Sequence, residues 1–392
     1  MRREKFILYT VPFSMDVVIG LITISIPLFA INLGANPLIL GGLGFTGSLL
    51  YVLLSPLFGR LSDHIGCKYL LFLGCLAYFS SSLALSFSSK VYQLFIFMAF
   101  VGISGAMFWP SLEVLVAQMK TGDFLPKRVS LFNISWCMGA AVGPLIGGMI
   151  FQVGARFPFY LASLLSLLMS LLIAGELFKD KGEKVFDEPE ENFLKENPSR
   201  KHSISNLSQE ETSSYLYVAW MANFANYFSV GTLRYLFPKL SVRLGIQPSI
   251  LGILFGIIAL FQTLTFYLLG KTIRWHYKLM PLIFLQLLGA FGLLLVFFTS
   301  CSLIFLLAFM FIGIAGGMTY FSSIFYSLND CENRGTKSGI HEAVLGSGAL
   351  FGPLVGGIFA QAYSLRTPYL LAIFVTSAAI IGEVLLVERR RS

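Results

Sequence analysis

The chain has 392 residues, of which 56% are hydrophobic and only 12% are charged, with a formal net charge of +8. Soluble domains carry about a quarter charged residues, so this composition excludes an ordinary soluble protein. The basic residues lie between apolar runs and form no patch interleaved with aromatic residues, which argues against nucleic-acid binding.

Apolar runs of about 20 residues recur along the whole sequence, and each is long enough to cross a bilayer as a helix. The runs are continuous rather than alternating, which favours helices over the strands of a membrane barrel. The first run has no signal-peptide cleavage pattern and is expected to remain as a spanning helix. Twelve spans are predicted, at about 6–31, 38–58, 69–88, 92–118, 129–152, 157–178, 213–239, 248–269, 278–299, 302–328, 337–362 and 366–387.

One long polar segment interrupts this series. Residues 179–212 are charged and rich in Glu, Lys, Ser and Asn, a composition typical of a flexible linker. We therefore predict an all-α membrane protein of twelve transmembrane helices in two six-helix bundles. The predicted parts are an N-terminal bundle (1–178), a cytoplasmic linker (179–212) and a C-terminal bundle (213–392).

Lysine and arginine are distributed unevenly between the two sides of these spans. If the N terminus is cytoplasmic, 22 of them fall on the cytoplasmic side and 5 on the other, with Arg234 inside a span. The positive-inside rule therefore predicts that both termini are cytoplasmic.

The two halves of the chain repeat one another. Gly-Pro-Leu-Ile-Gly-Gly at 143–148 and Gly-Pro-Leu-Val-Gly-Gly at 352–357 begin 209 positions apart, each inside an apolar run. Pro37 and Gly41 match Pro248 and Gly252 at an offset of 211. A six-span unit repeated in the same orientation gives two bundles related by an axis along the membrane normal.

A polar loop joins the second and third spans. Gly-Arg-Leu-Ser-Asp-His-Ile-Gly-Cys-Lys at 59–68 resembles the G-x-L-[GAS]-D-[RK]-x-G-R-[RK] signature of the major facilitator superfamily, with His64 and Cys67 replacing usual cations. The resemblance implies alternating access around a substrate site between two bundles, and a loop that latches the outward-open state. The gating-loop residues are Gly59, Arg60, Asp63, Gly66 and Lys68.

The repeated hexapeptide is part of a second motif. The fifth span resembles the G-x-x-x-G-P-x-x-G-G signature of the proton-coupled drug antiporters of this superfamily, which implies drug export. The alternative is a packing interface with no bearing on transport direction, since small residues let helices approach closely. Met98 also occupies the arginine position of a third family signature, so a standard proton relay is less expected. The helix-bend residues are Gly139, Gly143, Pro144, Gly147 and Gly148, with Gly352, Pro353, Gly356 and Gly357 in the second half.

Ionisable residues inside a membrane are costly and are usually functional. Asp16 lies about 15 Å into the first span, near the midplane, at 1.5 Å per residue. Our leading hypothesis is that this carboxylate accepts and releases the coupling proton, and the alternative is a structural hydrogen bond. Arg234 is expected to bind an anionic substrate group or to pair with Asp16, unless it snorkels outward.

Three further ionisable residues lie towards the cytoplasmic ends of their spans. Glu113, His341 and Glu342 are predicted to join proton coupling and to form a cytoplasmic gate, unless they are simply solvated. Asn223, Asn226, Tyr227 and Trp136 are candidate cavity residues, with interhelical hydrogen bonding as the alternative for the first three. Glu176 and Glu383 lie near helix ends and are expected to be solvated.

The predicted function is proton-coupled efflux of small amphipathic or hydrophobic compounds by a monomer in the plasma membrane of a prokaryote. Sugar or metabolite transport, lipid transport and a non-transporting receptor or scaffold are the alternatives. The five cysteines are scattered, and no metal cluster, phosphate loop or nucleophile elbow is present in the sequence. We therefore expect no enzyme activity, no ATP use, no metal and no cofactor; the expected partners are the substrate, protons and membrane lipids.

Overall fold

The computed structural model describes residues 6–117, 125–179, 209–272, 274–329 and 334–389, and within them it is entirely helical. The predicted linker falls mostly outside these residues, at 180–208. A short π-helical turn, η1 (Phe6–Thr10), leads into the first of twelve long helices. These helices are α2 (Val11–Asn32), α3 (Pro37–Ile65), α4 (Cys67–Ser86), α5 (Val91–Ala117), α6 (Leu125–Val153), α7 (Phe157–Lys179), α9 (Gln209–Arg243), α10 (Pro248–Gly270), α11 (Leu279–Phe298), α12 (Ser302–Asn329), α13 (Arg334–Ala362) and α14 (Thr367–Glu388).

Eleven of these described helices are long and apolar enough to cross a membrane. The exception is α9, whose 35 residues include Asn223, Asn226 and Arg234 within the stretch predicted to span. The predicted all-α architecture of twelve long helices is therefore confirmed, with α9 as the most polar of them.

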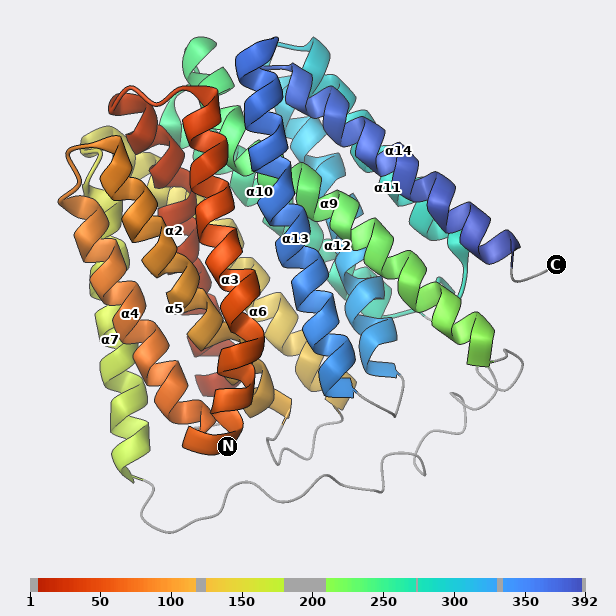
Figure 1. Cartoon of the computed structure of the whole chain (residues 1–392), viewed down its shortest axis with the longest axis horizontal. Coiled ribbons are helices and arrows are strands. Elements are labelled where there is room, and N and C mark those ends of the chain that lie inside the picture. The colour runs from red at the N-terminus through yellow and green to blue at the C-terminus, as the bar shows by residue number, and fades with distance from the viewer. Residues whose placement is uncertain (1–5, 118–124, 180–208, 273, 330–333, 390–392) are drawn as a thin grey trace.

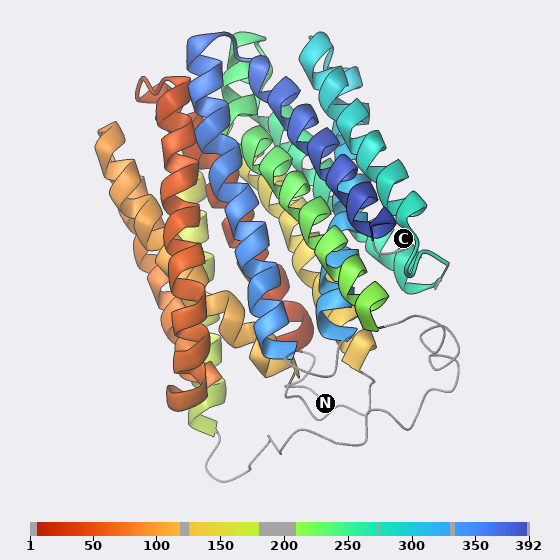
Figure 2. The same cartoon turned by 45° about the vertical axis from the view of Figure 1, so that its right-hand side comes forward.

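The helices form two groups, which face each other along their length. α2–α7 lie together on the red-to-yellow side, and α9–α14 lie together on the green-to-blue side (Figures 1 and 2). The groups meet mainly where α6 packs on α10 and where α3 packs on α13. The bundle boundaries at 178 and 213 stay a prediction.

The repeated hexapeptide provides close approaches between the two groups. A Cβ atom added to Gly148 of α6 would lie 3.2 Å from the Cα of Gly252 of α10. The equivalent atom on Gly357 of α13 would lie 3.1 Å from the Cα of Gly41 of α3. Gly148 and Gly357 are repeat partners, and so are Gly41 and Gly252, so the two contacts are related by the internal symmetry.

The same motif also packs inside each half. A Cβ on Gly143 would lie 2.8 Å from the Cα of Gly20 in α2, and one on Gly352 would lie 3.0 Å from the Cα of Phe228 in α9. Both α6 and α13 continue through their prolines, Pro144 and Pro353. The motif therefore holds three helices together on each side, which is the packing role expected of small residues in membrane helices.

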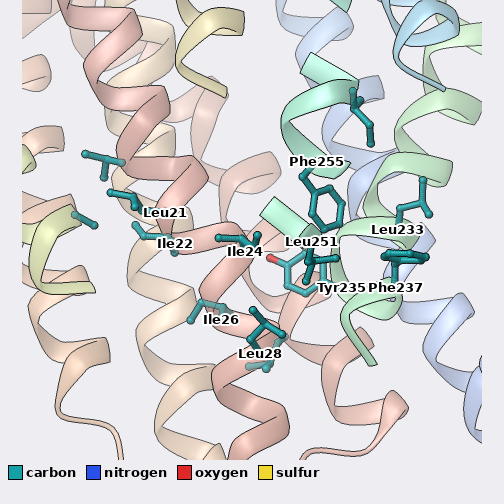
Figure 3. Close-up of a cluster of buried hydrophobic side chains, with 14 of the residues drawn as sticks. Leu21, Ile22, Ile24, Ile26, Leu28, Leu233, Tyr235, Phe237, Leu251 and Phe255 are labelled. Atoms are coloured by element: carbon teal, nitrogen blue, oxygen red, sulfur yellow. The ribbon is translucent and has the colours of Figure 1, made fainter. Parts of the chain in front are cut away.

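Apolar side chains from both halves form one core near the 33–36 and 244–247 connections. Leu21, Ile24 and Leu28 of α2 belong to the same cluster as Leu233 and Tyr235 of α9 and Leu251 and Phe255 of α10 (Figure 3). Several of these side chains are completely buried. Apolar packing thus joins the two halves in this region.

Polar contacts reinforce the same end. Lys239 Nζ on α9 donates a hydrogen bond of 2.8 Å to the carbonyl of Ala35, in the α2–α3 connection. On the other side, Gln152 Nε2 of α6 donates to Gln247 Oε1 at 3.3 Å and to Ser249 Oγ at 3.1 Å. Each contact joins residues of opposite halves, so this end is tied at two points.

The predicted loop between the second and third spans is a sharp turn at Gly66. Gly66 has φ +92°, a left-handed conformation that favours glycine, and its amide donates to Ser62 O at 3.0 Å. α3 extends to Ile65, so Gly59 and the exposed Arg60 lie on its last turns, and Lys68 lies in the first turn of α4. The side chains of Asp63 and His64 lie outside the described part of the chain.

Candidate functional site

Asp16 lies inside the N-terminal half, where α2 touches α6. The residue is 7% exposed, and its Oδ2 has no hydrogen-bond partner. A Cβ on Gly139 would lie 2.8 Å from the Asp16 Cβ, so the motif glycine leaves room for this side chain. A buried carboxylate oxygen without a partner is costly, and such groups are commonly functional in membranes.

Tyr227 occupies the symmetric position in the C-terminal half. It is the repeat partner of Asp16, and a Cβ on Gly348, the repeat partner of Gly139, would lie 3.0 Å from the Tyr227 Cβ. The internal symmetry thus places a carboxylate on one side and a phenol on the other. Both are positioned by equivalent glycines of the repeated motif.

Arg234 is a half-buried residue of α9 that interacts electrostatically with Asp16. No ion pair within 4.0 Å joins these two residues, both of which the structure describes. Tyr227 and Tyr235 are also within the electrostatic reach of Arg234. The guanidinium therefore lies among the polar groups of this region without a direct bond to Asp16.

Glu342 forms a direct hydrogen bond across the two halves. Tyr51 Oη on α3 donates to Glu342 Oε2 on α13 at 3.0 Å. The Glu342 side chain is 15% exposed, and its Oε1 lies 3.8 Å from Nε2 of the fully buried His341. His341 Nδ1 in turn lies 2.7 Å from Ser323 Oγ of α12. A polar chain therefore runs from α3 through α13 to α12.

Glu113, half-buried on α5, adds a second carboxylate from the N-terminal half. It interacts electrostatically with Glu342, and the Tyr51 phenol lies within reach of both carboxylates. Two carboxylates at this range repel when both are ionised. Protonation of either carboxylate removes this repulsion.

An aromatic wall lies beside these charged groups. The Trp136 ring of α6 is 5.5 Å from the Tyr320 ring of α12 and 6.2 Å from the Phe266 ring of α10. Tyr320 is also 6.4 Å from Tyr227 and 5.1 Å from His341, measured between ring centroids. Trp136 thus inserts from the N-terminal half among aromatic residues of the C-terminal half.

The two candidate asparagines are placed differently from Tyr227. Asn226 lines a small cavity inside the C-terminal half, next to Gly316 of α12. Asn223 is completely buried, and neither its amide nitrogen nor its amide oxygen has a partner. The sequence makes all three side chains candidates for the substrate cavity, whereas only Tyr227 joins the aromatic wall.

Sequence reasoning missed Tyr51 and misjudged Glu383. Nothing in the α3 sequence distinguishes Tyr51 as the residue that reaches the other half. Glu383 was expected to be solvated but is 0% exposed, and both of its oxygens accept hydrogen bonds from Gln286 Nε2 at 3.0 and 2.8 Å. α14 packs on α11 along its length, so a residue near its end is covered. The side chain of Glu176 lies outside the described part.

The curated proteins that are similar in sequence include bacterial proteins named for drug resistance. Quinolone resistance protein NorA of Staphylococcus aureus (strain Mu50 / ATCC 700699) is 26% identical over 412 residues, which cover 100% of this chain and 97% of NorA. Multidrug resistance protein 1 of Bacillus subtilis (strain 168) is 31% identical over 121 residues, or 31% of each chain.

Solved structures show the same fold. The nucleoside transporter NupG superposes with a TM-score of 0.68 at 12% identity and covers 98% of both chains. A bacterial homologue of the human lysosomal transporter Spinster, in an inward-facing and occupied conformation, has a TM-score of 0.68 at 13% identity, covering 98% of this chain and 94% of its own. At these identities the likeness concerns the fold alone.

The family comparison covers most of the sequence. The model of the Major Facilitator Superfamily matches residues 8–336. Transporters of this superfamily consist of two six-helix halves with a binding site between them and work by alternating access. The duplicated sequence, the loop motif, the twelve helices and this match agree, and the chain belongs to the Major Facilitator Superfamily.

Proposed function

We propose that the protein exports small amphipathic or hydrophobic compounds in exchange for protons. The observation that carries this proposal is the meeting of carboxylates with an aromatic wall between the halves. Glu113 and Glu342 come from opposite halves, and Tyr51 donates a hydrogen bond to Glu342. Trp136 of the N-terminal half packs against Tyr320 of the C-terminal half. The relatives named for quinolone and multidrug resistance support export of such compounds.

Asp16 is the proposed principal proton-binding group. Its Oδ2 is buried without a partner, and protonation of the carboxylate removes the cost of an uncompensated buried charge. Arg234 interacts electrostatically with this carboxylate, and the carboxylate is proposed to release the proton when the pathway changes sides. Arg234, Tyr227 and Trp136 are proposed to line the substrate cavity.

Glu113 and Glu342 are proposed as a second coupling element. When both are ionised their repulsion favours separation of α5 from α13, and a bound proton or cationic substrate allows them to approach. His341 is proposed to orient Glu342, since its ring is held by Ser323. As a gate, this cluster predicts that cysteines at 113 and 341 crosslink in the outward-open state; no crosslink there would count against the gate.

The proposed orientation follows from the distribution of lysine and arginine. With both termini cytoplasmic, the end tied by Lys239 and Gln152 faces outward, and the substrate enters from the cytoplasm. The gating loop at 59–68 and the linker at 179–212, which joins bundles 1–178 and 213–392, then lie in the cytoplasm. The proposed setting is a monomer in the plasma membrane of a prokaryote.

The test is transport by the purified protein in liposomes with an imposed pH gradient. Fluorescent lipophilic dyes and quinolones probe the proposed substrates, and a nucleoside, a sugar and a labelled phospholipid probe the other transport classes. Dye movement that stops when the gradient is dissipated supports proton-coupled export. Gradient-driven movement of the nucleoside, sugar or phospholipid alone would redirect the assignment, and movement of none would favour a non-transporting protein.

A further inference from the structure

A buried carboxylate lies in the C-terminal half, apart from the site between the halves. Glu383 of α14 is completely buried, and the amide nitrogen of Gln286 on α11 donates hydrogen bonds to both carboxylate oxygens. No cation lies within 4.0 Å of Glu383 among the described residues. An ionised carboxylate in this position lacks a compensating charge, and uncompensated buried charges are strongly unfavourable.

The Gln286 amide also has an unused acceptor. Its Oε1 is buried without a hydrogen-bond partner, and the residue is only 3% exposed. Gln286 lines a cavity of about 20 Å³, which has room for about one water-sized guest. An unsatisfied oxygen beside a cavity of this size is the arrangement expected where a donor or a cation binds.

The hydroxyl residues of the cavity can offer only lone pairs to such a guest, and Asn226 adds an amide oxygen and an amide nitrogen. Ser229 Oγ donates its proton to Ala225 O at 2.9 Å, and Thr376 Oγ1 donates to Ala372 O at 2.9 Å. Thr319 likewise donates to Gly316 O within its own helix, at 3.3 Å. These three hydroxyl protons are therefore engaged in hydrogen bonds within their own helices. The lone pairs left on the oxygens suit a positively charged guest that prefers hard ligands.

No charged side chain among the described residues of the helices packed on α14 interacts with Glu383. α11 carries no ionisable residue in its sequence, and Tyr227, His341 and Glu342 of α9 and α13 belong to the site between the halves. The buried phenols of α9, Tyr215 and Tyr235, do not interact with Glu383. Arg234 of α9 lies with Asp16. Among the described residues, Gln286 is the only side chain that interacts with the Glu383 carboxylate.

We propose that Glu383 and Gln286, with the cavity beside them, form a binding site for one monovalent cation, either a proton or Na⁺. Glu383 supplies the negative charge. Gln286 donates from its amide nitrogen to Glu383 and lines the cavity, where its amide oxygen is free to accept. The site lies within one half and between α11 and α14, so its occupancy stabilises the packing of these helices. It is independent of the transported compound, and its test requires no transport.

The test measures the unfolding midpoint of the purified full-length protein against NaCl and against pH. NaCl is exchanged for choline chloride at constant ionic strength, and a separate acidification series contains no sodium. Binding to the folded state raises the midpoint by mass action. A rise with NaCl assigns Na⁺ to the site, and a rise on acidification alone assigns a proton.

Two variants on α14 identify the residue responsible. Glu383→Gln removes the charge and is expected to abolish the response, whereas Glu388→Gln, which alters an exposed carboxylate of the same helix, is expected to keep it. Gln286→Leu, which keeps the carboxylate, is expected to shift the response to higher cation concentration. A wild type that responds to neither cation, or a Glu383→Gln variant that responds like wild type, would overturn the proposal and leave a cavity that holds water only.

Discussion

Tyr51 of α3 donates a 3.0 Å hydrogen bond to Glu342 of α13, and it thereby joins the two halves of the molecule across 291 residues of sequence. The bond forms where α3 and α13 cross, next to a second carboxylate, Glu113. A link at this point must break or change when one half rocks against the other. It therefore connects the charge state of the site to the conformation of the protein.

Tyr51→Phe removes this link while it keeps the aromatic ring. Loss of one partner leaves a Glu342 oxygen unpaired, which costs about 1–3 kcal/mol. Because about 1.4 kcal/mol corresponds to a tenfold change in an equilibrium, we expect a population shift of about tenfold away from the conformation seen here. Distance measurements between spin labels on the two halves report this shift. Tyr69→Phe, an exposed position on α4, is the control and is expected to change nothing.

Asp16→Asn tests the proposed proton-binding group. The amide is nearly isosteric with the carboxylate but cannot bind and release a proton, so transport is expected to lose its dependence on the pH gradient while substrate binding remains. Dye counterflow without a gradient measures the remaining activity, and gradient-driven transport measures coupling. Ser14→Ala, two residues earlier on α2, serves as the control. Normal coupling in Asp16→Asn would remove this residue from the mechanism.

The glycine contacts between halves predict a steric effect. Gly252→Val places a branched side chain against the backbone of α6, around Pro144 and Leu145, and overpacking of this kind costs about 1–3 kcal/mol. Gly41→Val is expected to act similarly against Pro353, because the two contacts are related by the internal symmetry. Both variants are expected to unfold at a lower temperature and to transport more slowly than the wild type.

Gly175→Val is the matched control for these glycine variants. Gly175 lies on α7 with no atom within 4 Å of the position that a Cβ would occupy. A valine there is expected to be tolerated. If Gly175→Val and Gly252→Val were equally harmful, helix propensity rather than contact between the halves would explain the effect.

The hydrogen bond from Lys239 to Ala35 O is expected to keep the two halves together near the 33–36 connection. Lys239→Met removes the hydrogen bond to Ala35 O, a loss of about 1 kcal/mol or more because the donor is charged. Labelling of a cysteine placed at Leu251, which is completely buried here, is expected to accelerate in this variant. Lys90→Met changes an exposed lysine and should leave the labelling rate unchanged. Equal rates in both variants would assign no role to the Lys239 bond.

Much of the fold follows from the sequence because its signals are local or repeated. Hydropathy gives the helices, and the offset between the copies of the hexapeptide gives the symmetry that pairs Gly148 with Gly252 and Gly357 with Gly41. The resemblance of the hexapeptide to an antiporter signature implies drug export. In the structure, its glycines pack against neighbouring helices. α9 was recognised as a span despite polar residues that lower its hydropathy.

The site depends on contacts that no local pattern encodes. In the sequence, Tyr51 resembles any other tyrosine of a membrane helix. Only the packing of α3 against α13 shows that it contacts Glu342. Glu383 was expected in water because it lies near a helix end, and only the packing of α14 on α11 shows that it is buried against Gln286. Asn226 and Tyr227 are neighbours in sequence, but they point to different surroundings because adjacent helix positions are separated by about 100° around the axis.

The central claim is that export is driven by protons, and proton movement measures it most directly. A pH-sensitive dye inside proteoliposomes should report a proton flux when a transported compound is added, and the flux should be lost in Asp16→Asn. The account predicts that compound and protons move in opposite directions and that both stop together. Transport of the compound at full rate with no accompanying proton flux would contradict it.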